Sequence, residues 1–244
     1  MQIRSSKDQA GFSLLEVIIA MGVTITMMGL ACSLLASAFW VRSREDRKSD
    51  AIADVQRALN IMTREISHAG LKIPGGLPSV ASNGIVAGDS NSASIRFVSN
   101  LNALPHSGNA YWEDSDVDDG DEDIKFLMYV DADRGQRYIV RYEKTGDTPT
   151  TVLANRIDSL IFRYYDEKVT YDTTVDVNGI CDITNVLNAS GVAESEVSPA
   201  AARFIVIAVG VTLPAVGTPG VAGYQPPSQV QLTSDVVLRN SIVY

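Results

Sequence analysis

Residues 12–41 read FSLLEVIIAMGVTITMMGLACSLLASAFWV, and Glu16 is the only charged residue in this run of 30. A helix rises ~1.5 Å per residue, so the run would be about 45 Å long, whereas about 20 apolar residues cross the hydrocarbon core of a bilayer. The apolar region of a secretory signal peptide is only about 7–15 residues long. The run therefore predicts a membrane-spanning helix rather than a cleaved signal or a buried core helix.

The helical pattern continues after the apolar run. Residues 42–70 contain no proline and no glycine before Gly70, and Pro74 prevents quick resumption. Apolar side chains recur at steps of three and four, as one helical stripe requires: Ile52, Val55, Leu59, Met62, Ile66 and Ala69. This stripe has two interpretations, packing on the protein's own sheet or a helix–helix seam with other subunits, and we expect the first.

The charge of the chain is divided unevenly. The 244 residues carry a net charge of −9, of which residues 71–244 contribute −10 and residues 1–70 contribute +1. A domain this acidic has no electrostatic reason to bind nucleic acid, so no nucleic-acid partner is expected. The two cysteines, Cys32 and Cys181, are too few for a disulfide scaffold and are expected to remain thiols.

From residue 71 the hydrophobic period changes to the alternation typical of strands. The expected strands are Ser94–Val98, Ile124–Val130, Arg137–Glu143, Ile157–Tyr165, Arg203–Leu213 and Gln229–Arg239. Residues 124–143 should form a hairpin, and residues 203–213 the most buried strand because they are almost continuously apolar. A Gly/Pro-rich loop at residues 214–227 should follow. The prediction is an α+β fold in which one long helix packs on one antiparallel sheet.

The most acidic segment is residues 113–123, EDSDVDDGDED, with eight acids in eleven positions. It fails the EF-hand template, because the glycine falls one position late. Asp114, Asp116 and Asp118 remain candidate ligands of a looser calcium loop, and the alternative is a solvated acidic loop. Residues 88–91, GDSN, resemble the first block of lipase-like hydrolases but lack a strand–elbow–helix context. We find no enzyme constellation and expect no catalytic residues.

The amino-terminal residues resemble a known processing site. The stretch KDQAGFSLLEV, residues 7–17, is similar to the cleavage motif of type IV prepilins and type II secretion pseudopilins. The resemblance implies that residues 1–11 are a leader peptide, and that prepilin peptidase cuts between Gly11 and Phe12 and methylates the new amino terminus of Phe12. It also implies that Glu16 pairs with the terminal amine of a neighbouring subunit during assembly, which would neutralise two charges that are costly in lipid.

Three further patches resemble PilW-type minor pilins and J-type pseudopilins: the helix end at residues 57–70, a mid-domain strand at residues 152–165 and a carboxy-terminal strand at residues 232–240. The resemblance implies a type IV pilin-like fold with four parts: the leader, a transmembrane and assembly helix at 12–41, an amphipathic continuation at 42–70, and an exported acidic β-rich domain at 71–244. No cofactor is expected, and calcium at the acidic loop is only a candidate.

The expected function is that of a minor pilin in the initiation or tip complex of a type IV pilus. The alternatives are a J-type minor pseudopilin and a membrane-anchored ligand-binding or enzymatic domain. Expected partners are prepilin peptidase, major and other minor pilins or pseudopilins, the assembly platform and the lipid bilayer. The resemblance places the leader in the cytoplasm and the domain in the periplasm of a bacterial inner membrane, before entry into the pilus or pseudopilus. The count of basic residues alone, two before the run and four after it, favours the opposite orientation.

Overall fold

The structure is a computed structural model that describes residues 13–73, 77, 79–101, 117, 119, 121–144, 148–155, 157–175, 180–221 and 224–239. By their internal contacts the residues divide into two units. The first contains residues 1–46 and 215–226, and the second contains residues 47–214 and 227–244. The first unit thus combines the start of the helix with a loop from near the end of the chain.

One helix, α1, runs from Leu14 to Ile66. It ends slightly before the predicted limit near residue 69, and residues 67–70 form turns. Gly70 has a positive φ of 77°, and its N–H donates to the carbonyl oxygen of Val98 at 2.9 Å. The predicted end of the helix near Gly70 is confirmed to within one turn, because glycine adopts the left-handed backbone that reverses the chain there.

Nine strands follow among the described residues: β1 Ser94–Val98, β2 Asp123–Asp131, β3 Gln136–Glu143, β4 Thr148–Asn155, β5 Ser159–Tyr165, β6 Thr170–Val175, β7 Cys181–Leu187, β8 Phe204–Leu213 and β9 Ser228–Val237. They form three antiparallel sheets, ordered β1-β2-β3-β4, β5-β8-β9 and β6-β7. The expectation of one sheet is therefore wrong. The general class, a long apolar amino-terminal helix followed by antiparallel β-structure, is confirmed.

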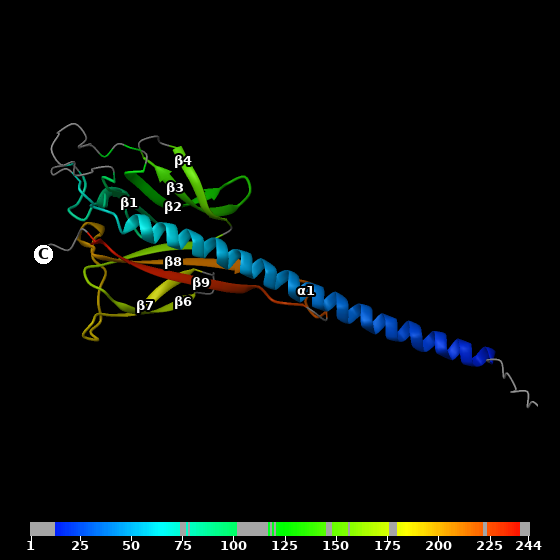
Figure 1. Ribbon diagram of the computed structural model, residues 1–244. Helices are drawn as coiled ribbons and strands as arrows, with labels where there is room; N and C mark the ends of the chain where they lie inside the picture. The colour runs from blue at the N-terminus through cyan, green and yellow to red at the C-terminus, as the bar shows by residue number, and fades with distance from the viewer. Residues whose placement is uncertain are drawn as a thin grey trace, which may run out of the picture. The chain divides into compact units, whose positions relative to one another are not determined.

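The second half of α1 supplies the centre of the main core. In Figure 1 this part of the helix lies between the β1–β4 sheet and the β5-β8-β9 sheet. Its buried side chains join one hydrophobic cluster with residues of both sheets: Val55, Ala58, Leu59, Met62 and Ile66. The predicted stripe therefore packs on the chain's own domain, although Ile52 is only half-buried.

Strand β8 is buried on both faces, which explains its continuous apolar sequence. One face, including Ile205 and Ile207, contacts the main cluster with α1. The other face, including Phe204 and Val206, belongs to a second cluster with Cys181 and Ile183 of the β6-β7 sheet. The prediction that residues 203–213 form the most buried strand is confirmed.

All six predicted strands are present with ends shifted by at most two residues, and the predicted hairpin is the β2–β3 pair. Strands β4, β6 and β7 were not predicted. The mid-domain patch at residues 152–165 is not one strand, because β4 ends at Asn155 and β5 begins at Ser159. Both cysteines are free thiols, as expected.

Candidate functional site: the exposed apolar helix

The first half of α1 exposes its apolar side chains on every side. Leu14 is 82% exposed and Ile25 is 71% exposed. In an 18-residue window of this helix with a mean hydropathy of 2.1, no residue is buried. A helix that is apolar all round belongs in a protein core or a membrane, and this part is not in the core. By length and composition α1 could cross a membrane, which is consistent with a single-pass anchor.

The hydroxyl groups in this half of the helix need no water. Each donates to a carbonyl oxygen one turn earlier in the helix: Thr24 to Ala20 at 2.7 Å, Thr26 to Val23 at 2.9 Å, Ser33 to Leu30 at 2.9 Å and Ser37 to Leu34 at 2.8 Å. Such bonds satisfy polar side chains within a helix in lipid, where an unpaired polar group is costly.

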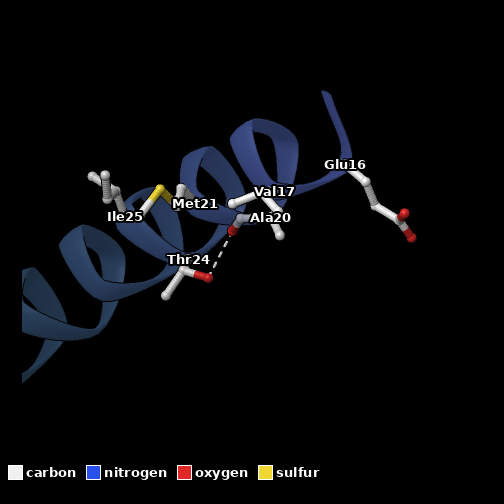
Figure 2. A pocket seen from close by; sticks show the side chains of 6 residues that line it. All are labelled: Glu16, Val17, Ala20, Met21, Thr24 and Ile25. Carbon is white, nitrogen blue, oxygen red and sulfur yellow. Dashed lines mark hydrogen bonds between the residues drawn. The ribbon is translucent and has the colours of Figure 1, made fainter. Parts of the chain in front are cut away.

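Glu16 is the exception to this local pairing. Its carboxylate is exposed and has no hydrogen bond or ion pair with the residues that the structure describes. Figure 2 shows the side chain directed away from the helix, beyond the face formed by Val17, Ala20, Met21, Thr24 and Ile25. This face consists of α1 residues alone, so it is an open surface rather than an enclosed cavity.

A helix cap that was not predicted from the sequence accompanies Glu16. Ser13 precedes the helix, and its Oγ accepts a hydrogen bond from the N–H of Leu15 at 3.3 Å. The spacing of Ser13 and Glu16 matches a capping box, in which the glutamate would bind back to the serine N–H. That reciprocal bond is not formed in the described part of the chain. The described residues therefore offer the Glu16 carboxylate no partner.

Small residues leave one face of this helix open to close approach. Gly22, Thr26, Gly29 and Ser33 recur at steps of four, three and four. A methyl group added at Gly22 or Gly29 would meet no atom within 4 Å. The chain's own packing therefore does not require these glycines, whereas helices that pack in a membrane favour small residues at their contacts.

Two sets of predicted site residues cannot be placed. Gly11 and Phe12, the predicted cleavage site, lie outside the described residues. So do Asp114, Asp116 and Asp118, the candidate calcium ligands. Among the residues that are described, no group of three or more His, Cys, Asp or Glu side chains could hold a metal ion.

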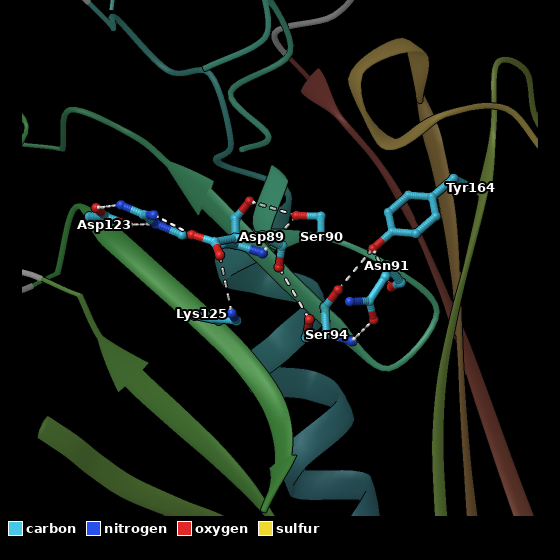
Figure 3. A network of polar contacts seen from close by, with 8 residues as sticks. Asp89, Ser90, Asn91, Ser94, Asp123, Lys125 and Tyr164 are labelled. Carbon is cyan, nitrogen blue, oxygen red and sulfur yellow. Dashed lines mark hydrogen bonds and ion pairs between the residues drawn. The ribbon is translucent and has the colours of Figure 1, made fainter. Parts of the chain in front are cut away.

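The GDSN segment has a structural explanation in the polar network of Figure 3. Arg96 donates to both carboxylate oxygens of Asp123, at 2.8 and 2.6 Å, and also binds Asp89. The hydrogen bond from Arg96 lowers the pKa of Asp89, against the effect of partial burial. The Oγ of Ser90 accepts from the N–H of Arg96 at 3.0 Å and donates to its carbonyl oxygen at 3.2 Å.

The same network joins two sheets. The hydroxyl of Tyr164, on β5, donates to the carbonyl oxygen of Asn91 at 3.0 Å, close to the start of β1. Burial raises the pKa of Tyr164, so this donor stays protonated. These polar groups are therefore used to hold the β1 and β5 segments together.

Comparisons of the chain with protein-family models, with curated proteins and with solved structures give no match.

Proposed function

We propose that this chain is a minor pilin that is anchored in the bacterial inner membrane, processed between Gly11 and Phe12, and assembled into the initiation or tip complex of a type IV pilus. The observation that carries the proposal is Glu16, the only charged residue of the apolar run, whose carboxylate has no hydrogen bond or ion pair with the described residues and lies in the first turn of an exposed helix. It stands four residues after the Phe12 that cleavage would make the new amino terminus.

The energetics explain how such a carboxylate would direct assembly. An acidic side chain at the centre of a membrane-spanning helix costs about 2.5–3.5 kcal/mol on insertion scales, which is an upper limit for Glu16 in the first turn. The amine of a mature Phe12 carries the opposite charge and would lie at a similar depth in a neighbouring subunit. The two charges neutralise each other only when the subunits dock in the correct register, so the pair selects that register.

The two halves of α1 differ in burial, and this difference supports the same proposal. Residues 55–66 bury their apolar stripe in the chain's own core, so this stripe is already occupied. The apolar residues 14–41 are exposed and include the small-residue face around Gly22 and Gly29. Contacts between the helices of neighbouring subunits would therefore form along the first half of α1, where lipid is exchanged for protein.

The runner-up is a J-type minor pseudopilin of a type II secretion system, because the same helix and the same charge pair would serve it equally. The partners would be prepilin peptidase, the assembly platform, and other pilins or pseudopilins. The acidic domain would face the periplasm and then the tip of the fibre. Deleting the gene and scoring both surface fibres and secreted enzymes separates the two readings.

The test compares Glu16→Gln with the control Glu45→Gln, an exposed glutamate beyond the apolar run. Both variants lose one negative charge and keep a similar shape. We expect both to reach the membrane and to yield an amino-terminal methylated Phe12 by mass spectrometry, and we expect only Glu16→Gln to be missing from fibres. Normal incorporation of Glu16→Gln would refute the pairing role. An intact Met1 in a host with the peptidase would refute the processing.

A further inference from the structure

The loop between β8 and β9 folds into a compact hairpin of its own. Val216 and Gln225 exchange two backbone hydrogen bonds, at 3.0 and 2.9 Å. Near the tip, the N–H of Val221 donates to the carbonyl oxygen of Thr218 at 3.1 Å, and Gly220 has a φ of 85°. Proline at 219 followed by glycine with positive φ is typical of a type II turn. The loop therefore satisfies much of its backbone internally.

Arg44 fastens this loop to α1. Its Nη1 donates to the side-chain oxygen of Gln225, and its Nη2 donates to the carbonyl oxygen of Pro226, both at 2.8 Å. The loop, orange in Figure 1, lies beside the helix, and residues 215–226 belong to the same unit as residues 1–46. A segment from near the end of the chain is thus attached to the apolar helix.

The attachment lies at the end of the apolar run. Arg44 comes three residues after Val41, or about 4.5 Å further along the helix. Ser37, seven residues before Arg44 and so on the same helix face, is the only half-buried residue in the range 13–42. It lies about 6 Å before Val41. The attachment therefore lies just beyond the end of the apolar run, on the helix face that Arg44 shares with Ser37.

The composition of the loop suits the boundary between lipid and water. No charged residue occurs between Arg203 and Asp235, in a chain of which 20% is charged. Val221 at the tip is 60% exposed. On the helix, Trp40 and Arg42 precede Arg44, and Trp40 is 53% exposed while Arg42 is exposed. Aromatic rings and basic side chains after an apolar span are typical of the headgroup layer of a bilayer.

We propose that residues 215–221 and 224–226 of this loop are a membrane contact that lies in the headgroup layer of the bilayer, with Val221 at the acyl boundary and Arg44 as the anchor to α1. The partner is the phospholipid surface. The contact sets the depth at which the helix stops in the membrane. This inference rests on the membrane anchoring in the proposed function, but not on assembly into a fibre.

The test uses the full chain in phospholipid vesicles with an environment-sensitive fluorophore on one cysteine. The native Cys32 reports the span, and Cys181 is 1% exposed and should not react. Val221→Cys in a Cys32→Ala background reports the loop. Val192→Cys in the same background is the control, because Val192 is 59% exposed in the turn after β7. Lipids carry a quencher either in the headgroup or at mid-chain.

We expect the mid-chain quencher to act on Cys32, the headgroup quencher to act on Val221→Cys, and neither to act on Val192→Cys. If Cys32 is quenched while Val221→Cys behaves like the control, the loop proposal is overturned and the anchor stands. If Cys32 is not quenched, the membrane anchor itself is overturned. If two Val221→Cys copies crosslink and neither lipid quencher acts on them, the partner of the loop is a second copy of the chain, and the proposal of a phospholipid partner is overturned.

The role of Arg44 has a matched control in Arg42, an exposed arginine whose side chain makes no hydrogen bond or ion pair with the described residues. Arg44→Ala should lower the headgroup quenching of Val221→Cys to the level of Val192→Cys. Arg42→Ala, with the same loss of charge, should leave that quenching unchanged. Equal effects of the two substitutions would show that charge alone draws the loop to the membrane, and would overturn Arg44 as its anchor.

Discussion

Gly84 and Gly70 lie backbone against backbone, so closely that a Cβ atom on Gly84 would stand 1.9 Å from the nitrogen of Gly70 and 2.5 Å from its Cα. Val98, the last residue of β1, joins the two. It accepts from the N–H of Gly70 at 2.9 Å and donates to the carbonyl oxygen of Gly84 at 2.8 Å. The end of α1 is thereby held against β1.

Gly84→Ala should strongly destabilise the domain, because backbone atoms rather than a flexible side chain occupy the space of the new methyl group. We expect a loss of more than about 4 kcal/mol in the free energy of unfolding, or no folding. The control is Gly191→Ala, since Gly191 also has a positive φ, 75°, but no atom within 4 Å of its Cβ position. It should cost only the backbone strain, about 1–2 kcal/mol. Equal midpoints in thermal unfolding of the two variants would contradict the close approach.

Met62→Ala tests the packing of the second half of α1. Met62 is fully buried in the cluster between the sheets, so its truncation leaves a cavity and should cost about 2–5 kcal/mol. The neighbouring Asn60 is exposed, and Asn60→Ala should change stability by less than about 0.5 kcal/mol. Denaturant unfolding of the detergent-solubilised chain measures both. If Met62→Ala leaves the free energy of unfolding unchanged, the stripe does not pack on the chain's own domain and would instead contact another subunit.

Asp89 should make the domain sensitive to acid. Its pKa in the folded state is lowered from the ordinary 3.8, mainly by the hydrogen bond from Arg96 and further by the charge of Lys125. A lowered folded-state pKa stabilises the fold above the ordinary pKa, and this stabilisation is lost as the pH falls through the folded-state value. Because the side chain of Asp89 is 38% exposed, solvent screening limits the effect.

We therefore expect Asp89→Asn to lower the thermal unfolding midpoint at pH 6. Between about pH 5 and pH 3, the midpoint of this variant should fall less than the midpoint of the parent chain. Asp133→Asn, in the turn between β2 and β3, serves as the control for the removal of one carboxylate. The measurement is the thermal midpoint at each pH, followed by circular dichroism. Parallel acid profiles for the parent chain and Asp89→Asn would contradict a stabilising ion pair at this position.

The sequence by itself determined the elements whose signal is local. The apolar run with Glu16 specified a helix long enough to span a membrane, and the apolar stripe that includes Met62 specified the face that packs on the domain. Six strands were predicted because alternation along a strand reports the backbone period directly. Strand β8 was predicted as the most buried because both of its faces are apolar.

Two of the three missed strands, β6 and β7, lacked that signal. Strand β6, Thr170–Val175, is polar and mostly exposed, and β7, Cys181–Leu187, contains Asp182 and Asn185, of types that are depleted in strands. These two strands are stabilised by pairing with each other and by the hydrophobic cluster that β7 forms with the outer face of β8. Strand propensity alone does not predict them.

Only the tertiary structure decided how the strands divide into three sheets, where Gly84 meets Gly70, and which residue Arg44 binds. Arg44 and Gln225 are 181 residues apart in the sequence. No periodicity or local propensity contains such a contact, because it depends on how distant segments pack after each has formed. The side chains that join distant segments are therefore visible only in the folded chain.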